Sequence, residues 1–318
     1  MASSSKQRIL ITTGDFDGIG WEVTAKALNA LGPKAGVQFI YYRHAQSLSK
    51  KQPTLGKKFK HLVLASLDDV RQVPFDHKTA IEIRSGKLPA HWVEDAAVAC
   101  MAGEFQALVT APLSKTSIIA AGLKDIGHTE ILARISGKKD LFMGFIGKKF
   151  SVLLATGHQP LQKALANLEP NRFDFAVRAA AQLRQLLPAA QKKLPIALVG
   201  VNPHAGEGGL IGNEEQWMRK FADQKFLVGP LVPDAAFLPQ NWKRYSVYLC
   251  AYHDQGLIPF KMVHGFTGGV HLTMGLPFVR TSVDHGTAKE IYGRNTAEAG
   301  SMKDALIVAM RLIKENSK

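Results

Sequence analysis

Three histidines occupy similar positions along the chain. His158 follows the apolar run FSVLLAT, His204 follows PIALVGV, and His253 follows YSVYLCA. Neutral imidazoles bind divalent metal ions and can leave coordination positions open for a substrate. Each histidine alone could equally cap a turn or hydrogen-bond to a carbonyl group, because the spacing is not that of a local metal-binding motif. Their shared position after an apolar run favours a metal site.

Charged residues gather around the last of these histidines. Asp254 follows His253 directly in AYHDQGLIPFK, and Lys261 ends the same stretch. The carboxylate could orient a ligand or relay a proton, and the lysine is a second candidate for that role. Similar residues near other apolar runs are Lys115 in TAPLSK, His128 and Thr129 in IGHTE, and Arg280 in LPFVRTS. Each could be an ordinary surface residue, but together they predict a ligand with a phosphate or carboxylate group.

Three turns contain glycine beside polar residues. The glycines of GDFDGIGWE (14–22) do not match G-x-G-x-x-G, so a Rossmann dinucleotide site is not predicted. An anion-binding helix N-terminus and a plain tight turn both stay open there. NPHAGEGGLIGNEE (202–215) could bring backbone N–H groups close to a ligand, or form a flexible loop. The third turn lies in RTSVDHGTAKEIYG (280–293) and contains Asp284, His285, Gly286 and Thr287. These residues predict a polar pocket.

Short β-rich runs alternate with helical patterns, which predicts an α/β fold with a mostly parallel sheet. The expected strands are 8–13, 37–42, 61–66, 106–111, 150–156, 195–201 and 245–251. The expected helices are 21–31, 90–102, 129–136, 172–187, 214–223 and 301–315. Five of the strands run into glycine, proline, histidine, aspartate or lysine at their carboxyl ends. Open α/β sheets bind their ligands at that edge, so the chemistry is expected there.

Length and composition limit the class of protein. With 318 residues the chain exceeds the usual size of one core, so two domains are expected. The sequence has no apolar run of the ~18 residues that a membrane span needs, and its start lacks a secretory pattern. Cys100 and Cys250 are the only cysteines, so we expect no disulfides and a cytoplasmic location.

The net charge of +14 permits nucleic-acid binding. The basic residues are dispersed, however, and are densest at 49–61, and the sequence has no zinc-finger spacing or ribonucleoprotein signature. We therefore expect a solvated basic surface, with no nucleic-acid and no membrane partner. An acidic small ligand fits the charge balance equally well.

Several motifs in order resemble one family. TAPLSK, GHTE, NPHAGEGG, YHDQG and GLPFVRTSVDHGTA are similar to those of the 4-hydroxythreonine-4-phosphate dehydrogenase family of vitamin B6 biosynthesis, from about residue 104 to 315. The resemblance implies two α/β/α domains with a central cleft, of the isocitrate/isopropylmalate dehydrogenase type. It implies a cofactor-side domain of 1–112 plus 278–318 and a metal- and dimer-side domain of 113–277. It also implies a homodimer with the active site at the subunit interface.

The resemblance also implies roles for individual residues. The metal ligands would be His158, His204 and His253, with one Zn, Mg, Co or Mn ion per subunit. The substrate contacts would be His128, Thr129, Lys261, His271, Arg280 and Lys115, and the catalytic residues Asp254 and Lys261. Asp284, His285, Gly286 and Thr287 would contact NAD or NADP. The implied reaction oxidises 4-phosphohydroxy-L-threonine to a β-keto acid that decarboxylates to 3-amino-2-oxopropyl phosphate.

The chain departs from the family pattern at three places. One is an extra residue between His253 and His271, which the alignment of GFTGGVH needs. His271 stands where the family usually has asparagine, and Phe16, Asp17 and Trp21 replace proline, alanine and proline in the first glycine turn. Asp17 would add a negative charge near an anion site. The alternative is therefore a dehydrogenase of the same family that acts on another phosphorylated hydroxy acid, such as threonate or erythronate 4-phosphate. A metal-dependent hydrolase is a more distant alternative, and a nucleic-acid-binding module ranks last.

Overall fold

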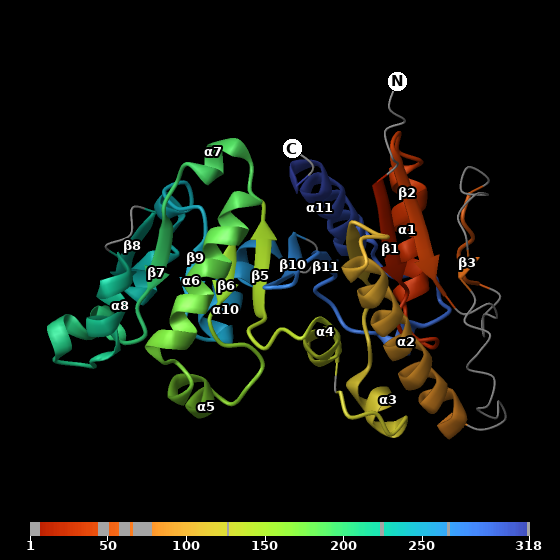
Figure 1. Ribbon diagram of the computed structural model, residues 1–318, viewed down its shortest axis with the longest axis horizontal. Helices are drawn as coiled ribbons and strands as arrows, with labels where there is room; N and C mark the ends of the chain where they lie inside the picture. The colour runs from red at the N-terminus through yellow and green to blue at the C-terminus, as the bar shows by residue number, and fades with distance from the viewer. Residues whose placement is uncertain are drawn as a thin grey trace. The chain divides into compact units, whose positions relative to one another are not determined.

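The computed structural model in Figure 1 describes residues 7–43, 51–56, 64–65, 78–125, 127–222, 226–265 and 268–316. The chain forms two compact units, Met1–Lys139 with Leu276–Lys318, and Asp140–Gly275. The first boundary lies later than the expected 112/113. The reason is that α3 (Lys115–Ala120) and α4 (His128–Ser136) both pack on α2 (Lys78–Met101), which belongs to the first unit.

The first unit contains a parallel sheet in the order β3-β2-β1-β4-β11. These strands are β1 (Gln7–Thr12), β2 (Val37–Tyr42), β3 (Leu64–Ala65), β4 (Ala107–Thr110) and β11 (Val279–Ser282). The parallel arrangement and the strands expected at 8–13, 37–42 and 106–111 are confirmed. Of the strand expected at 61–66, only β3 lies within the described residues, and most of the basic stretch 49–61 lies outside them.

The helices of the first unit cover this sheet. Besides α2, α3 and α4 they are α1 (Gly20–Leu31), η4 (Lys289–Ile291) and α11 (Gly300–Asn316). Helix α2 begins earlier than expected because the chain stays helical through Pro89. Helices α1 and α11 pack on each other, and α11 also packs on β4 and β11. The apolar stripe of α11 is buried there and includes Met302, Leu306, Ala309 and Ile313.

The second unit contains a mixed sheet in the order β10-β5-β6-β9-β7-β8. These strands are β5 (Phe142–Gly147), β6 (Val152–Leu154), β7 (Ile196–Val199), β8 (Leu227–Leu231), β9 (Tyr248–Cys250) and β10 (Gly269–Met274). Strand β5 pairs antiparallel with β10 and β6, whereas β6, β9, β7 and β8 run parallel. The antiparallel strands β5 and β10 were not among the expected elements.

Helices lie on both faces of this sheet. The longer ones are α6 (Pro170–Gln185), α8 (Glu214–Ala222) and α10 (His253–His264), and the shorter ones are α5 (Leu161–Ala166), α7 (Ala189–Lys192), η2 (Pro203–Gly209), α9 (Pro233–Ala236) and η3 (Pro239–Asn241). A Cβ on Gly144 would lie 3.1 Å from Leu183 of α6, whereas the next residue, Phe145, packs on Phe260 of α10. Successive residues of a strand face opposite sides, so α6 and α10 cover opposite faces.

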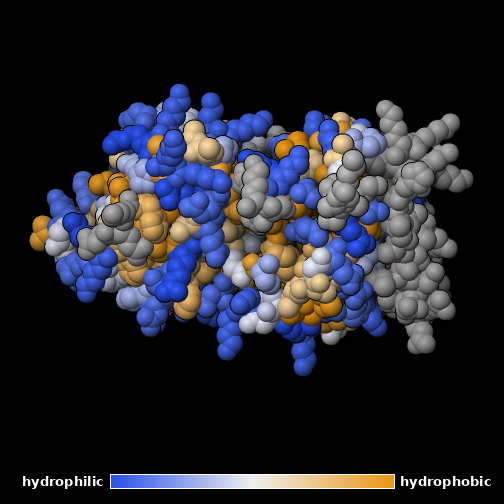
Figure 2. All heavy atoms as spheres, turned by 45° about the horizontal axis from the view of Figure 1, so that its top comes forward, coloured by the Kyte–Doolittle hydropathy of each residue, from blue (hydrophilic) through white to orange (hydrophobic). Residues whose placement is uncertain are grey.

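Both units have apolar interiors and largely hydrophilic surfaces. In the second unit an aromatic cluster contains Phe150, Tyr248 and Phe260. On the face shown in Figure 2, hydrophilic residues alternate with smaller apolar areas. Cys100 and Cys250 are buried free thiols. Within the part of the chain that the structure describes, every helix is too short or too polar to cross a bilayer.

Candidate functional site

Hydroxyl residues end three neighbouring strands of the first unit at the same level. The parallel register aligns Thr12 of β1 with Thr110 of β4, and Thr110 with Ser282 of β11. The Thr110 hydroxyl donates to Ser282 Oγ at 3.0 Å, and the Ser282 hydroxyl lies 3.1 Å from the Thr110 carbonyl oxygen that accepts from it. These buried groups form a polar layer at the carboxyl edge of the sheet, the edge where the sequence predicts ligand binding.

Arg280 lies beneath this layer. It precedes Ser282 by two positions in β11, so both side chains point to the same face of the strand. Its side chain is almost fully buried, and Nη2 donates to Thr110 Oγ1 at 2.5 Å. Burial lowers the pKa of Arg280 to about 9, which still leaves the guanidinium charged at neutral pH. A buried cation of this kind can bind the phosphate or carboxylate of a substrate.

His128 is the first residue of α4 and lies close enough to Arg280 to sense its charge. Burial, and next the positive charge of Arg280, hold the pKa of His128 well below its usual range. Its Nε2 atom is covered and makes no hydrogen bond to any described residue. A neutral histidine with an unused ring nitrogen beside a buried cation can hydrogen-bond to a ligand. Thr129 follows it in the first turn of α4.

Lys115 does not join this buried group. It is exposed at the start of α3, where the preceding Ser114 caps the helix by accepting a hydrogen bond from Ser117 N at 3.2 Å. A residue that the sequence reasoning missed, Asp15, is tied to the same segment, because its Oδ1 accepts from Ser114 N at 3.0 Å. Asp15 is 3% exposed, and burial raises its pKa to about 6.

Lys289, also missed, balances the charge of the first glycine turn. Its ammonium lies 3.3 Å from Asp15 Oδ2 and 3.0 Å from Asp17 Oδ1, and donates to Ser117 Oγ at 2.7 Å. The negative charge that Asp17 adds is therefore paired with a cation, contrary to the expectation of an extra charge near an anion site. Nothing in the motif marked Lys289, because it follows the DHGTA turn and meets Asp17 only in the folded chain.

The turn 284–287 is fixed from two sides within the first unit. Thr287 O accepts a hydrogen bond from Ile19 N at 3.0 Å, which ties the turn to the first glycine turn. The Ser301 hydroxyl donates to Asp284 Oδ1 at 2.8 Å, and Asp284 N donates to Ser301 Oγ at 3.2 Å. These hydrogen bonds within the chain fix the shape of the turn.

Two residues of this turn offer contacts to a ligand. His285 Nδ1 donates to Gly286 O at 2.9 Å, while its covered Nε2 makes no hydrogen bond to the described residues. Gly286 is exposed, and a Cβ at that position would meet nothing within 4 Å. Open backbone beside an unused ring nitrogen suits the cofactor contact that the resemblance implies.

Two of the three predicted metal ligands meet in the second unit. His158 follows β6 and His253 follows β9, and these strands pair in parallel. Their ring centroids lie 4.9 Å apart. His253 Nδ1 lies 2.7 Å from Asp254 Oδ1, so the carboxylate accepts the Nδ1 proton and the lone pair of the neutral ring is on Nε2. Carboxylates often fix a metal-binding histidine in this way.

His204 is not joined to this pair within one chain. Among the described residues, no group of three histidine, cysteine, aspartate or glutamate side chains is arranged to hold a metal ion. His204 is exposed in η2, the segment after β7, where the backbone of residues 204–208 is not helical. The pair His158 and His253 fits two positions of a metal site, and a three-histidine site that draws on a second subunit stays a prediction.

The backbone around His204 is unusual. His204, Ala205, Gly206, Glu207 and Gly208 all have positive φ, between 43° and 74°, so residues 204–208 form a left-handed turn. A left-handed conformation costs roughly 1–2 kcal/mol for each residue other than glycine. Strain of this kind persists only where the surroundings impose it, and it is common at functional sites.

The remaining predicted residues of the second unit are Lys261 and His271. Lys261 is exposed on α10, the helix that begins at His253. His271 lies in β10 and stacks on Phe145, with ring centroids 4.9 Å apart and part of the ring exposed. A histidine at this position therefore gains a stacking contact with Phe145 that an asparagine could not make.

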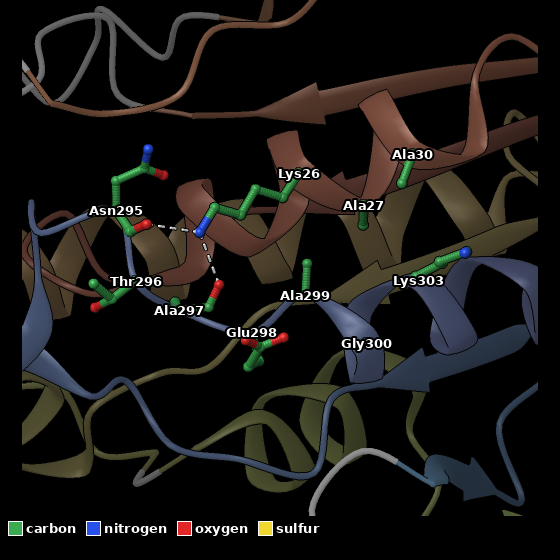
Figure 3. Close-up of a pocket in the computed structure, with 10 residues that line it drawn as sticks. All are labelled: Lys26, Ala27, Ala30, Asn295, Thr296, Ala297, Glu298, Ala299, Gly300 and Lys303. Carbon is green, nitrogen blue, oxygen red and sulfur yellow. Dashed lines mark hydrogen bonds between the residues drawn. The ribbon is translucent and has the colours of Figure 1, made fainter.

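A pocket of about 570 Å³ in the first unit was not predicted (Figure 3). It lies between α1 and the start of α11, and none of the predicted site residues line it. Lys26 of α1 points into its wall, where the ammonium donates to Asn295 O at 3.0 Å and to Ala297 O at 2.9 Å. Lys303 and Glu298 line the same pocket.

The sequence and fold match known proteins over nearly their whole length. Residues 21–309 match the family model described as pyridoxal phosphate biosynthetic protein PdxA. The chain is 34% identical to a 4-hydroxythreonine-4-phosphate dehydrogenase of Sulfurihydrogenibium sp. and 33% identical to a D-threonate 4-phosphate dehydrogenase of Pectobacterium atrosepticum. Each alignment covers 96% of this chain and 98% of the relative.

Comparison with solved structures also identifies the fold. The crystal structure of 4-hydroxythreonine-4-phosphate dehydrogenase from Klebsiella pneumoniae aligns with a TM-score of 0.79 and 29% identity, over 96% of this chain and 99% of that one. An isocitrate dehydrogenase from Methylococcus capsulatus aligns with a TM-score of 0.52 and 11% identity over 98% of this chain and 87% of that one, which shows a shared fold alone. The expected fold class is confirmed.

Proposed function

The chain belongs to the PdxA family, whose members are dehydrogenases, and we propose that it oxidises 4-phosphohydroxy-L-threonine with NAD or NADP and a divalent metal. The product would be a β-keto acid that loses CO₂ to give 3-amino-2-oxopropyl phosphate. The observation that carries this proposal is the pair His158 and His253 at the ends of two parallel strands, with Asp254 holding the His253 ring.

The metal would be held by this pair and by His204, with ligands from both subunits of a homodimer. The neutral imidazole donors suit Zn or Co better than Mg or Mn, because Mg and Mn prefer oxygen ligands. When bound, such an ion supplies a Lewis acid that lowers the pKa of a substrate hydroxyl. Asp254 fixes the orientation of His253, and it or Lys261 would relay the hydroxyl proton.

The acidic groups of the substrate would be bound mainly by Arg280 and His128. Arg280 supplies a buried positive charge, and His128 supplies an unused ring nitrogen next to it. Thr129, Lys115, Lys261 and His271 are proposed as further substrate contacts. A phosphorylated hydroxy acid carries two anionic groups, so it would gain from both the fixed charge and the hydrogen bonds.

The nicotinamide cofactor would be held at Asp284, His285, Gly286 and Thr287. When bound it supplies the hydride acceptor, while the protein fixes its position. The hydrogen bonds from Ile19 and Ser301 fix the shape of this turn, which would reduce the entropy lost when the cofactor binds.

A second copy of the chain would complete the site. Helix α10 begins with His253 and carries Ile258 and Met262, which are 59% and 82% exposed. The two side chains are four positions apart and so lie on one face of the helix, which a second subunit would cover. A homodimer that buries this helix would bring the proposed metal ligands to the subunit interface.

The proposal is tested by reduction of NAD or NADP at 340 nm, after treatment with a chelator and with each of Zn, Co, Mn and Mg restored. We expect the highest kcat/KM with 4-phosphohydroxythreonine. Without metal we expect no reduction of NAD or NADP. Equal or greater turnover of D-threonate 4-phosphate would support the second candidate, which the similarity to the Pectobacterium enzyme and the presence of His271 favour. Chelator-sensitive release of phosphate without a nicotinamide would instead identify a hydrolase.

A further inference from the structure

The left-handed turn 204–208 is attached to the rest of the second unit by a buried carboxylate. Glu215, in the first turn of α8, is 2% exposed. Its Oε1 accepts from Val201 N and from Asn202 N, each at 2.7 Å. Its Oε2 accepts from Asn202 Nδ2 at 3.0 Å. Three donors from the two residues that enter the turn therefore converge on one side chain.

The contacts around Glu215 allow few other conformations of the turn. A Cβ on Gly206 would lie 2.6 Å from Glu215 Oε2 and 2.8 Å from Gly212 O, so only glycine fits against the carboxylate. The side-chain nitrogen Nδ2 of Asn202 also donates to Glu214 Oε2 at 2.7 Å. Turning the Asn202 amide over would set its oxygen against both carboxylates. The turn and the carboxylate are thus fitted to each other.

The Glu215 side chain stays ionised in this position. Burial by itself raises the pKa of Glu215, but the hydrogen bonds from Asn202 and Val201 outweigh it, and the pKa falls below its ordinary value. The charge is stabilised by N–H donors, which also fixes the direction of the backbone. A glutamine at this position would present an NH₂ group to the Asn202 donor.

A second side chain joins the same segment to the His253 loop. Gln255 Nε2 donates to Gly200 O at 2.6 Å, and Gln255 Oε1 accepts from Ala251 N at 2.7 Å. Gly200 precedes the His204 turn, and Ala251 precedes His253. The two loops are therefore connected by side-chain hydrogen bonds as well as through their strands, β7 and β9.

We propose that Glu215 is a positioning residue that holds the turn 204–208 in the left-handed form and so presents His204, with Gln255 as its secondary support. The part that concerns metal affinity rests on the metal site of the proposed function. Residues behind the ligands of a metal site commonly change its affinity by about 10-fold to 100-fold when replaced.

The test compares Glu215→Gln with Glu214→Gln, which removes a neighbouring charge but leaves the two backbone donors on Glu215. Amide hydrogen exchange of the full chain measures the turn, and Co²⁺ titration followed by its absorption spectrum measures the site. In Glu215→Gln we expect amide hydrogen exchange at Val201 and Asn202 to rise about tenfold, because the variant loses one hydrogen bond to a charged group. We expect Co²⁺ affinity to fall at least about tenfold.

Gln255→Met, with Gln216→Met as the exposed control, should give a smaller change of the same kind. The thermal midpoint of each variant shows whether the fold is kept. Unchanged exchange at 201–208 in Glu215→Gln would overturn the proposal, and so would faster exchange with unchanged Co²⁺ affinity. If the unmodified protein binds no divalent ion, the proposed metal site fails instead, and hydrogen exchange alone decides whether Glu215 holds the turn.

Discussion

The ammonium of Lys289 lies 3.0 Å from the carboxylate of Asp17, and 29% of the lysine side chain is exposed. The same ammonium neutralises the buried Asp15 and donates to Ser117. One side chain thus connects the first glycine turn, α3 and the residues that follow the proposed cofactor turn. Its removal leaves two carboxylates facing each other without that cation.

Lys289→Met is therefore expected to destabilise the protein by about 1–3 kcal/mol at pH 7.5, since it leaves a buried charge without its partner. The loss should be smaller at pH 5, where Asp15 is protonated. Urea unfolding at pH 7.5 and pH 5 measures the loss of stability at each pH. Adding Asp17→Asn to Lys289→Met should restore part of the stability. A loss of equal size at both pH values would contradict the electrostatic explanation.

Asp15 itself gives stability a pH dependence of a definite sign. Its pKa in the folded protein is raised to about 6 from an ordinary value of 3.8, chiefly by burial. Its contribution is therefore fully present below about pH 3.8 and is lost as pH rises through 6. A shift of this size corresponds to roughly 3 kcal/mol.

Asp15→Asn removes this titration and keeps an oxygen that can accept from Ser114 N. The free energy of unfolding of the native chain, minus that of the variant, should fall as pH rises from 4.5 to 7. Urea unfolding at pH 4.5, 5.5 and 7 tests this. The control is Asp125→Asn, the same substitution at a partly exposed aspartate. A difference that rises with pH would show that Lys289 dominates over burial.

The sequence predicted the parts of the site that follow a strand, and missed those that depend on a partner elsewhere. His158 and His253 were predicted to lie together because polar residues after apolar runs mark the carboxyl edge of a parallel sheet, and the pairing of β6 with β9 does bring them together. Lys289 carried no such mark, because its relation to Asp17 exists only in the folded chain. Glu215 looked like an ordinary acidic residue in the first turn of a helix, which is a favourable position for any carboxylate.

The elements that were missed broke local rules. Residues 253–264 form helix α10 although they contain Gly256 and Pro259, both unfavourable inside a helix. Gly256 is required there, because a Cβ would lie 2.8 Å from Leu154. Strand β5 contains Gly144, which packs closely against Leu183 of α6. In both places packing with a distant segment outweighs local propensity, and that contact cannot be read from the segment alone.

His264 should make the second unit sensitive to acid. Its Nε2 accepts from Lys149 N at 3.0 Å, and its Nδ1 donates to Phe260 O at 2.9 Å, so the bonded ring is neutral. Burial lowers its pKa below the ordinary 6.5. The unfolded chain therefore takes up a proton first, and the stability present above pH 6.5 is lost as pH falls towards the lower folded pKa.

His264→Ala is expected to reduce the free energy of unfolding by about 1–3 kcal/mol at pH 8, because it leaves Lys149 N and Phe260 O without this partner. The difference from the native protein should narrow at pH 5. Urea unfolding followed by tryptophan fluorescence measures it, with His91→Ala, a half-buried histidine of the first unit, as control. A difference that stays constant between pH 8 and 5 would mean that the ring acts through packing on Phe150 and Phe260 alone.

Replacement of His253 separates binding of the metal from folding. In His253→Ala the Asp254 carboxylate loses its imidazole partner but stays solvated, since 69% of its side chain is exposed. We therefore expect a thermal midpoint within a few degrees of the native value, because surface changes of this kind alter stability by only about 0.5 kcal/mol. Zn²⁺ or Co²⁺ content measured by mass spectrometry should fall, and NADH formation should fall by at least about 1000-fold, the loss expected when a Lewis acid is removed. His91→Ala should retain both. Turnover close to native in His253→Ala, with metal still bound, would show that His253 is not a ligand and would redirect the search to other donors.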